Sequence, residues 1–318
     1  DNAKGFLIGE ENKGLSSMFT MMNLERIIVG IQGLGIAETA YQNSLSYAKE
    51  RKQGKSNNNK DNKTDEIIKH ADIRRSLLNM KSIIEGQRSL AFWLSQQVDV
   101  SLNHSNEDIR KEADEMVSLM TPVVKSFFSD MGMEITNEAI QVFGGYGYTK
   151  DQGIEQLYRD NRITPIYEGT NSVQAIDLVF RKVLTNKILD KFVTSIKSEI
   201  KMNDNDNPEL KRLIDILEEK IVILLNFAKW LEEKIKIQKD DVSAACNDFL
   251  KVLGYVALGF TWLKMTKISF KNINKNKVFY YEKINTAKYF FDKIFPRVDS
   301  HYKSAIAGSD SIMKAKFH

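Results

Sequence analysis

The sequence has very little cysteine, proline and histidine. Its 318 residues include one cysteine, four prolines and four histidines. Because Cys246 stands alone, an intramolecular disulfide is excluded, which is typical of proteins that work in a reducing compartment. The histidines are spread along the chain and form no Glu-x-x-His pair, so a di-iron helical bundle is excluded and we predict no metal site.

Other signals of common functions are also missing. The longest apolar run, VLGYVALGFTWL, ends at Lys264 and is too short to cross a bilayer. It therefore predicts a buried helix, and we predict no membrane span. The 46 basic and 42 acidic residues are scattered along the chain, which gives little support to nucleic-acid binding. We find no signal peptide, no Walker phosphate loop, and no strand to carry a hydrolase nucleophile.

Helical periodicity is present almost everywhere. It predicts helices over residues 23–54, 65–103 and 107–142, the last with a bend near Pro122, and a fourth from the break after residue 170 to Leu184. The polar stretch between the first two is predicted to be a solvated loop. The fold class is therefore all-α, with an antiparallel four-helix bundle over residues 23–185.

A smaller helical domain is predicted over residues 186–318. A polar segment around residues 185–208 marks the boundary, and three helical segments follow it. They are LKRLIDILEEKIVILLNFAKWLEEKI, VSAACNDFLKVLGYVALGFTWLKM and FYYEKINTAKYFFDKIFPRV.

The stretch IYEGTNSV raises the question of function. Pro165 disfavours helix just before it, and Thr170 begins a run of good N-cap residues, so Glu168 lies in a short break. Free backbone N–H groups after Glu168 would then face whatever occupies the break. A lone glutamate in such a place is also compatible with an ordinary cap or surface carboxylate.

Several motifs in order decide between these alternatives. The stretches GEENKGLSSMFTMMNLER, IQGLGIAE, YAKERKQG and QVFGGYGYTKDQGIEQLYRDNRITPIYEGTN together resemble the C-terminal half of a flavin-dependent acyl-CoA dehydrogenase. The resemblance covers residues 5 to 184. The remainder resembles the extra helical domain of one subgroup, which includes 3-methylmercaptopropionyl-CoA dehydrogenases.

The resemblance implies a catalytic role for Glu168. In this family the glutamate of the YEGT motif is the base that removes the proton alpha to an acyl-CoA thioester, while the beta hydrogen leaves as hydride to N5 of FAD. Preorganised donors, including the backbone N–H of that glutamate, hold the thioester oxygen. Gly169 would allow close approach of the thioester and flavin to the backbone.

The resemblance also implies cofactor and subunit contacts. The basic tripeptide would meet the FAD pyrophosphate of a neighbouring subunit, the QVFGG segment would embrace its ADP part, and the residues after the base would contact the flavin. These residues are Arg51, Lys52, Gln53, Gln141, Val142, Phe143, Gly144, Gly145, Thr170, Asn171 and Ser172. His70 would be a further cofactor-side residue. Such a shared site implies a homodimer or homotetramer.

The substrate side is implied by the segment Asn23, Leu24, Glu25 and Arg26, which matches the part of the family near the thioester arm. Glu25 occupies the position from which isovaleryl- and long-chain-type members supply their base. Because this chain also has the YEGT glutamate, Glu25 is a second carboxylate that helps Glu168, tunes it, or is an ordinary helix residue. Many members of the family have an aromatic residue directly after the basic tripeptide, whereas this chain has Gly54 there.

The resemblance covers only part of the family's length. Residues 1–22 match the end of the family's middle β domain, and we expect the chain, which opens without methionine, to be a piece of a longer protein. The isolated piece is expected to bind FAD weakly and to lack turnover. An electron-transferring flavoprotein is the expected electron acceptor, and a bacterial cytoplasm or, alternatively, a mitochondrial matrix is the expected location. An acyl-CoA oxidase and a non-catalytic helical assembly module remain the alternatives.

Overall fold

The computed structural model describes residues 2–60, 63–201 and 207–317. Within these ranges every regular element is a helix, and extended pairing is limited to an antiparallel bridge between Lys52 and Glu66. This confirms the all-α prediction. None of the helices in the described ranges is both long and apolar enough to cross a membrane.

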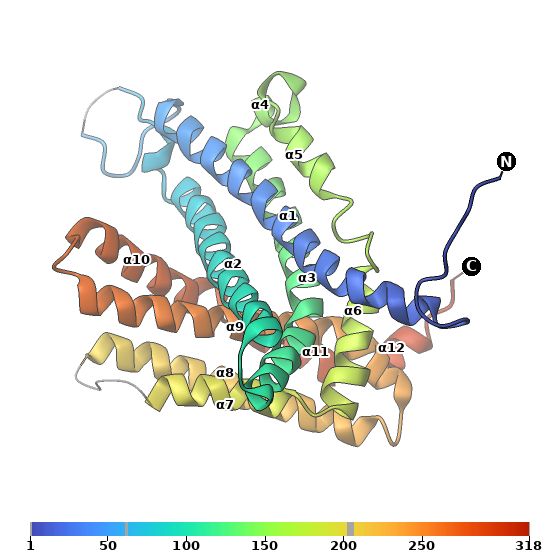
Figure 1. Cartoon of the computed structure of the whole chain (residues 1–318). Coiled ribbons are helices and arrows are strands. Elements are labelled where there is room, and N and C mark those ends of the chain that lie inside the picture. Colours follow the sequence, from blue (N-terminus) through green and yellow to red (C-terminus); the bar gives the residue numbers. More distant parts are fainter. Residues whose placement is uncertain (1, 61–62, 202–206, 318) are drawn as a thin grey trace.

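Three long helices form the first bundle. They are α1 (Gly14–Glu50), α2 (Ala71–Asn103) and α3 (Glu107–Phe143), and Figure 1 shows α1 running beside α2 and α3. The fourth member is α6 (Asn171–Asp177), which continues as the π-helical segment η3 (Leu178–Thr185). The predicted ends at residues 142 and 184 therefore agree closely with the structure.

The start of α3 shows why the sequence forms a helix here. The Asn106 side chain accepts hydrogen bonds from the backbone N–H groups of Asp108 and Ile109, at 2.8 and 3.2 Å. Two acidic residues follow in the first turn, where negative charge favours the helix dipole. The helix continues through the buried Pro122 and ends at Gly144, whose φ of 62° suits glycine.

Three predicted helix boundaries were wrong. The first helix begins at Gly14 instead of residue 23 and ends at Glu50, because residues 51–54 leave it to bond with the backbone of residues 65–67. The second predicted helix is divided into the short 3-10 helix η1 (Ile67–Lys69) and α2. Whether residues 1–22 belong to another domain stays a prediction.

Short helices that the periodicity missed connect α3 to α6. They are α4 (Gly145–Tyr148), η2 (Lys150–Gln152) and α5 (Ile154–Asn161), and each is too short for a periodic signal. They lead to the turn of residues 162–170, which precedes α6 and contains Glu168.

Further helices make up the C-terminal part. They are α7 (Leu189–Lys201), α8 (Pro208–Lys234), α9 (Lys239–Asn272), α10 (Lys277–Tyr289), η4 (Phe290–Ile294), α11 (Arg297–Ile306) and α12 (Asp310–Met313). Helix α7 lies within the segment 185–208, where no helix was predicted, and the domain boundary itself stays a prediction. The last predicted helix is interrupted around Pro296, so it forms α10, η4 and α11.

Helix α9 joins the two parts through a shared core. Its Trp262 donates a hydrogen bond from Nε1 to the backbone oxygen of Ser82 in α2, at 3.0 Å. Its Tyr255 packs edge-on against Phe127 of α3, with ring centroids 4.8 Å apart. The buried apolar residues form one continuous cluster from α1 to α11, so the C-terminal helices support the bundle directly.

Candidate active site

The turn before α6 holds Glu168 in an unusual backbone conformation. Its φ is 55°, a left-handed value that is uncommon for a residue with a side chain, and the φ of Gly169 is 86°. The backbone oxygen of Glu168 accepts hydrogen bonds from Nε of Arg26 and Nε2 of Gln174, both at 3.3 Å. Helices α1 and α6 therefore both hold this peptide in place.

The turn leaves polar groups open. The backbone N–H groups of Glu168, Gly169 and Thr170 donate to no acceptor among the described residues. One carboxylate oxygen of Glu168, Oε2, is buried and also has no hydrogen-bond partner there. Buried polar groups in proteins are nearly always paired, so an unpaired carboxylate beside free donors indicates a place for a ligand.

A polar network lies beneath the turn. Asn171, the first residue of α6, accepts a hydrogen bond from Nζ of Lys125 at 2.8 Å and donates from Nδ2 to Oδ1 of Asp130 at 2.7 Å. Burial lowers the pKa of Lys125 to about 8, which Asp130 partly opposes, while burial raises the pKa of Asp130.

Tyr167 connects the two candidate carboxylates. Its hydroxyl donates to Oε1 of Gln32 on α1. Burial raises the pKa of Tyr167, and the negative charges of Glu168 and Glu25 raise it further. Both carboxylates therefore act electrostatically on the same phenol, and Glu25 itself is half-buried.

Part of the predicted substrate segment lines a cleft that Arg26 connects to this turn. The cleft has a volume of about 510 Å³ and is lined by Asn23, Leu24 and Arg26 together with residues of α2, α3, α6 and η3, whereas Glu25 and Gly169 are not among its lining residues. Nη1 of Arg26 also donates to Oδ1 of Asn23, at 3.4 Å. Arg26 thus bridges the cleft and the Glu168 backbone.

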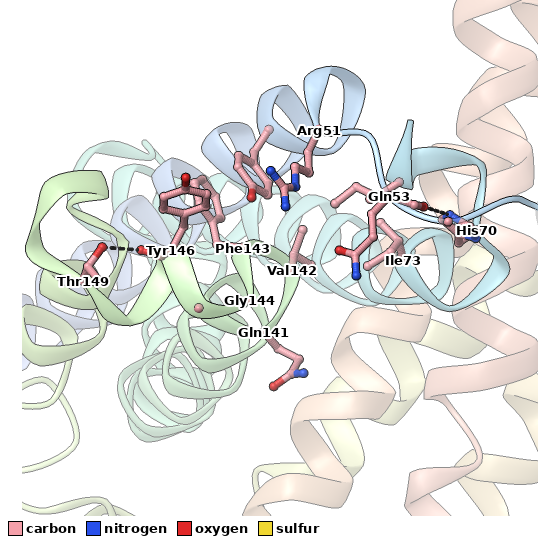
Figure 2. Close-up of a pocket in the computed structure, with 14 residues that line it drawn as sticks. Arg51, Gln53, His70, Ile73, Gln141, Val142, Phe143, Gly144, Tyr146 and Thr149 are labelled. Atoms are coloured by element: carbon pink, nitrogen blue, oxygen red, sulfur yellow. Dashed lines mark hydrogen bonds between the residues drawn. The ribbon is translucent and has the colours of Figure 1, made fainter. Parts of the chain in front are cut away.

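Most of the predicted cofactor residues line a second cavity at the far end of α1. It has a volume of about 730 Å³, and Figure 2 shows Arg51 and Gln53 on one side and Gln141, Val142 and Gly144 on another. Phe143, Gly145 and His70 complete the predicted members of its lining. The structure therefore brings residues from separate motifs to one cavity, and their binding of FAD stays a prediction.

Local contacts position this lining. Phe143 stacks on Tyr47 of α1 with ring centroids 4.2 Å apart. The guanidinium of Arg51 lies over the ring of Tyr146, 5.8 Å from its centroid. A ring nitrogen of His70, Nε2, lies 2.7 Å from the backbone oxygen of Gln53, which ties the start of α2 to the cavity.

Some predicted cofactor residues have other roles in the structure. Lys52 lies outside the cavity lining, and its Nζ is 3.7 Å from a carboxylate oxygen of Glu66. Thr170 caps α6 by accepting from the N–H of Val173 at 3.4 Å, and Ser172 accepts from Asn247 at 3.5 Å. The side chain of Asn171 is hydrogen-bonded to residues of α3. The flavin contacts of Thr170, Asn171 and Ser172 therefore stay predictions.

The sequence reasoning missed Lys125, Asp130 and Gln174. Lys125 lies within the apolar run TPVVKSFF, where the helical register was the one signal that it would be buried.

No group of three or more histidine, cysteine, aspartate or glutamate side chains in the described part of the chain could hold a metal ion.

Comparison with known proteins defines the class of this fold. Residues 12–183 match the family described as "Acyl-CoA dehydrogenase, C-terminal domain", and residues 190–316 match "Acetyl-CoA dehydrogenase C-terminal like". The first match covers more than half of the chain, so the chain belongs to the acyl-CoA dehydrogenase family.

Individual relatives give a more detailed view. The chain is 45% identical over 184 residues to 3-methylmercaptopropionyl-CoA dehydrogenase of Ruegeria pomeroyi, over 58% of this chain and 31% of that protein. It is 29% identical to the broad-specificity linear acyl-CoA dehydrogenase FadE5 of Mycobacterium tuberculosis, over 94% of this chain and 51% of that protein.

The fold is also similar to that of a solved structure. An acyl-CoA dehydrogenase from Bacillus anthracis, complexed with FAD, superposes with a TM-score of 0.73 at 22% identity, covering 96% of this chain and 52% of the other. This likeness extends through both helical parts. In all three comparisons the chain spans from about a third to about half of the relative's length.

Proposed function

We propose that this chain forms the C-terminal helical part of an FAD-dependent acyl-CoA dehydrogenase, with Glu168 as the catalytic base. The observation that carries the proposal is the Glu168 turn, where an unpaired buried carboxylate oxygen lies beside backbone N–H groups that have no acceptor in the described ranges. Family membership supports an acyl-CoA thioester as the ligand of this turn.

The residues of the turn suit removal of a proton alpha to a carbonyl group. The carboxylate of Glu168 takes the alpha proton, and the electron pair left on carbon forms the new double bond as the beta hydrogen departs as hydride. Free N–H groups at residues 168–170 are suited to stabilise the negative charge that develops on the thioester oxygen. Bound FAD supplies the acceptor for that hydride.

The chain's own residues fit the adenine end of this cofactor. Arg51 offers a guanidinium for phosphate oxygens, Gln141 an amide, and Gly144 a backbone that a phosphate or sugar can approach closely. The exposed position of Arg51 leaves the guanidinium accessible.

The two sites imply a shared cofactor between subunits. Arg26 lies on α1 and Arg51 directly follows its last residue, so a rise of about 1.5 Å per residue separates them by about 37 Å along the helix axis. The Arg51 cavity and the Glu168 turn of one chain therefore cannot both lie at the reacting end of the same flavin. This supports a homo-oligomer whose subunits share FAD. We also propose an electron-transferring flavoprotein as the acceptor of the electrons.

The test is a Glu168→Gln substitution in the chain expressed together with any coding sequence that lies upstream of it. Glutamine keeps the shape and cannot accept the proton, so we expect the anaerobic bleaching of flavin by acyl-CoA to slow by about 100- to 10,000-fold. The substrates are 3-methylmercaptopropionyl-CoA and a short linear acyl-CoA. Glu25→Gln is the matched control, and we expect its rate to stay within about 10-fold of the parent.

Three results would each contradict a part of the proposal. Full bleaching by the Glu168→Gln protein would exclude Glu168 as the base. A protein that is folded but binds no flavin, with and without its upstream sequence, would favour an assembly module. Rapid reoxidation of the reduced protein by air, with no response to an electron-transferring flavoprotein, would indicate an oxidase.

A further inference from the structure

Lys125 is a fully buried cation directly behind the Glu168 turn. It lies on α3, and its side chain has no exposed surface. The charged groups that face it are Asp130 on the same helix, Arg26 on α1 and Glu168 in the turn. Burying a charged amine is costly, so a lysine here needs partners of its own.

Asn171 is the group that Lys125 holds. Oδ1 of Asn171 accepts from Nζ of Lys125 at 2.8 Å. On its other side, Nδ2 donates to Oδ1 of Asp130 at 2.7 Å, to Oγ of Ser129 at 3.0 Å and to the backbone oxygen of Ser126 at 3.2 Å. Both ends of this amide are therefore fixed to α3, which prevents it from rotating.

Asn171 in turn closes the Glu168 turn. Its backbone N–H donates to the backbone oxygen of Pro165 at 3.0 Å, and it is the first residue of α6. Residues 165 and 171 are thereby held together, and Glu168 lies between them with its left-handed φ of 55°. A strained conformation of this kind costs about 1–3 kcal/mol and persists only where the surroundings enforce it.

We propose that Lys125 is a positioning residue of the active site, which holds Asn171 and through it the backbone turn that presents the Glu168 carboxylate and the free N–H groups. Asp130 completes the clamp from the opposite side of the amide. The proposal rests on Glu168 being the catalytic base for its effect on turnover, whereas the clamp itself can be observed in the isolated chain.

The first test is hydrogen exchange in the 318-residue chain. We expect Lys125→Met and Asn171→Ala to speed the exchange of the hydrogen-bonded backbone amides of this turn, those of Ile166, Tyr167 and Asn171, by about 10-fold or more, because the turn opens more often when the clamp is lost. Lys220→Met is the matched control, since Lys220 is a buried lysine on α8 whose partners, Asp299 and Glu219, are not part of this turn. It should leave these amides unchanged.

The second test is turnover in the chain joined to its upstream sequence. We expect Lys125→Met to lower kcat by about 10- to 100-fold with little change in KM, because misplacing a catalytic group weakens the chemical step.

The outcomes separate the two proposals. Unchanged exchange in residues 166–172 for both Lys125→Met and Asn171→Ala would overturn the clamp, whatever the activity shows. Faster exchange together with a parent protein that never bleaches flavin would sustain the clamp and overturn the proposed function. If Lys125→Met fails to fold, Asn171→Ala alone decides, because it removes the amide and keeps the charges of Lys125 and Asp130.

Discussion

At the scale of single residues, the structure gives different surroundings to side chains that look equivalent in the sequence. Arg51 and Lys52 are adjacent cations at the end of α1, yet Arg51 lines the cavity of Figure 2 and Lys52 lies beside Glu66. The reason is the extended backbone after Glu50, which sends successive side chains to opposite sides.

This difference predicts unequal effects on cofactor binding. Arg51→Gln should weaken FAD binding by about 1.5–3 kcal/mol, roughly 10- to 100-fold, because a charge-assisted hydrogen bond to phosphate is lost. Lys52→Gln, its neighbour, should change the affinity by less than about 3-fold. Titration of the apoprotein with FAD, followed by flavin fluorescence, measures both. Equal losses in the two variants would contradict the assignment.

The buried lysine predicts how stability depends on pH. The pKa of Lys125 is about 8 in the folded chain, below its ordinary value of 10.5, so between these pH values the unfolded chain binds more protons. This group therefore makes the folded form more stable as pH rises from 8 to 10.5, and below pH 8 its unfavourable burial is fully present.

Urea unfolding at several pH values checks this sign. The free energy of unfolding of the parent chain, minus that of Lys125→Met, should increase between pH 8 and pH 10. A difference that stays flat or decreases over this interval would show that Lys125 is not a buried cation with a lowered pKa.

At the scale of elements, the long α1 helix contains glycines with opposite roles. Gly35 is exposed and has open space where a Cβ would lie. Gly30 is buried, and a Cβ there would be 2.5 Å from the backbone oxygen of Val124 on α3. The first glycine only lowers helix propensity, whereas the second allows α1 and α3 to approach each other.

The same substitution should thus have opposite effects at these two positions. Gly35→Ala should raise the free energy of unfolding by about 0.5–1 kcal/mol, because alanine favours the helix. Gly30→Ala should lower it by about 1–3 kcal/mol, because the two helices must move apart. Chemical denaturation followed by circular dichroism measures both, and destabilisation by Gly35→Ala would contradict the open space beside it.

At the scale of the whole molecule, the C-terminal helices are part of the same core as the bundle. Trp262 of α9 fits against Gly86 of α2, where a Cβ would come within 2.9 Å of its Nε1. The buried Phe127 of α3 packs against Tyr255 and Gly254 of α9. Removing the C-terminal part would expose this apolar surface.

Truncation tests this dependence. A chain ending at residue 186 should lose its cooperative unfolding transition and bind a hydrophobic dye, because burial of about 25 cal/mol per Å² of apolar surface is lost along α2 and α3. The intact chain should unfold in one transition by fluorescence and by circular dichroism. A truncated chain that unfolds as cooperatively as the intact one would show two independent domains.

Much of this protein was determined by the sequence alone. The periodicity of apolar residues specified the helices, with α3 predicted almost to the residue, because a helix buries one face and the sequence repeats accordingly. The motifs around Glu168 and Arg51 specified the family, since each needs particular residue types at fixed positions in a turn or helix end.

Only the tertiary structure decided which residues meet. Lys125 and Asn171 are far apart in the sequence and carry no periodic signal that joins them, yet the packing of α6 on α3 brings them to 2.8 Å. The same holds for Arg51 and Gln141, which share a cavity because α1 and α3 end at the same side of the bundle. Helical periodicity records which face is buried, whereas the partner across that face is determined by how the helices pack.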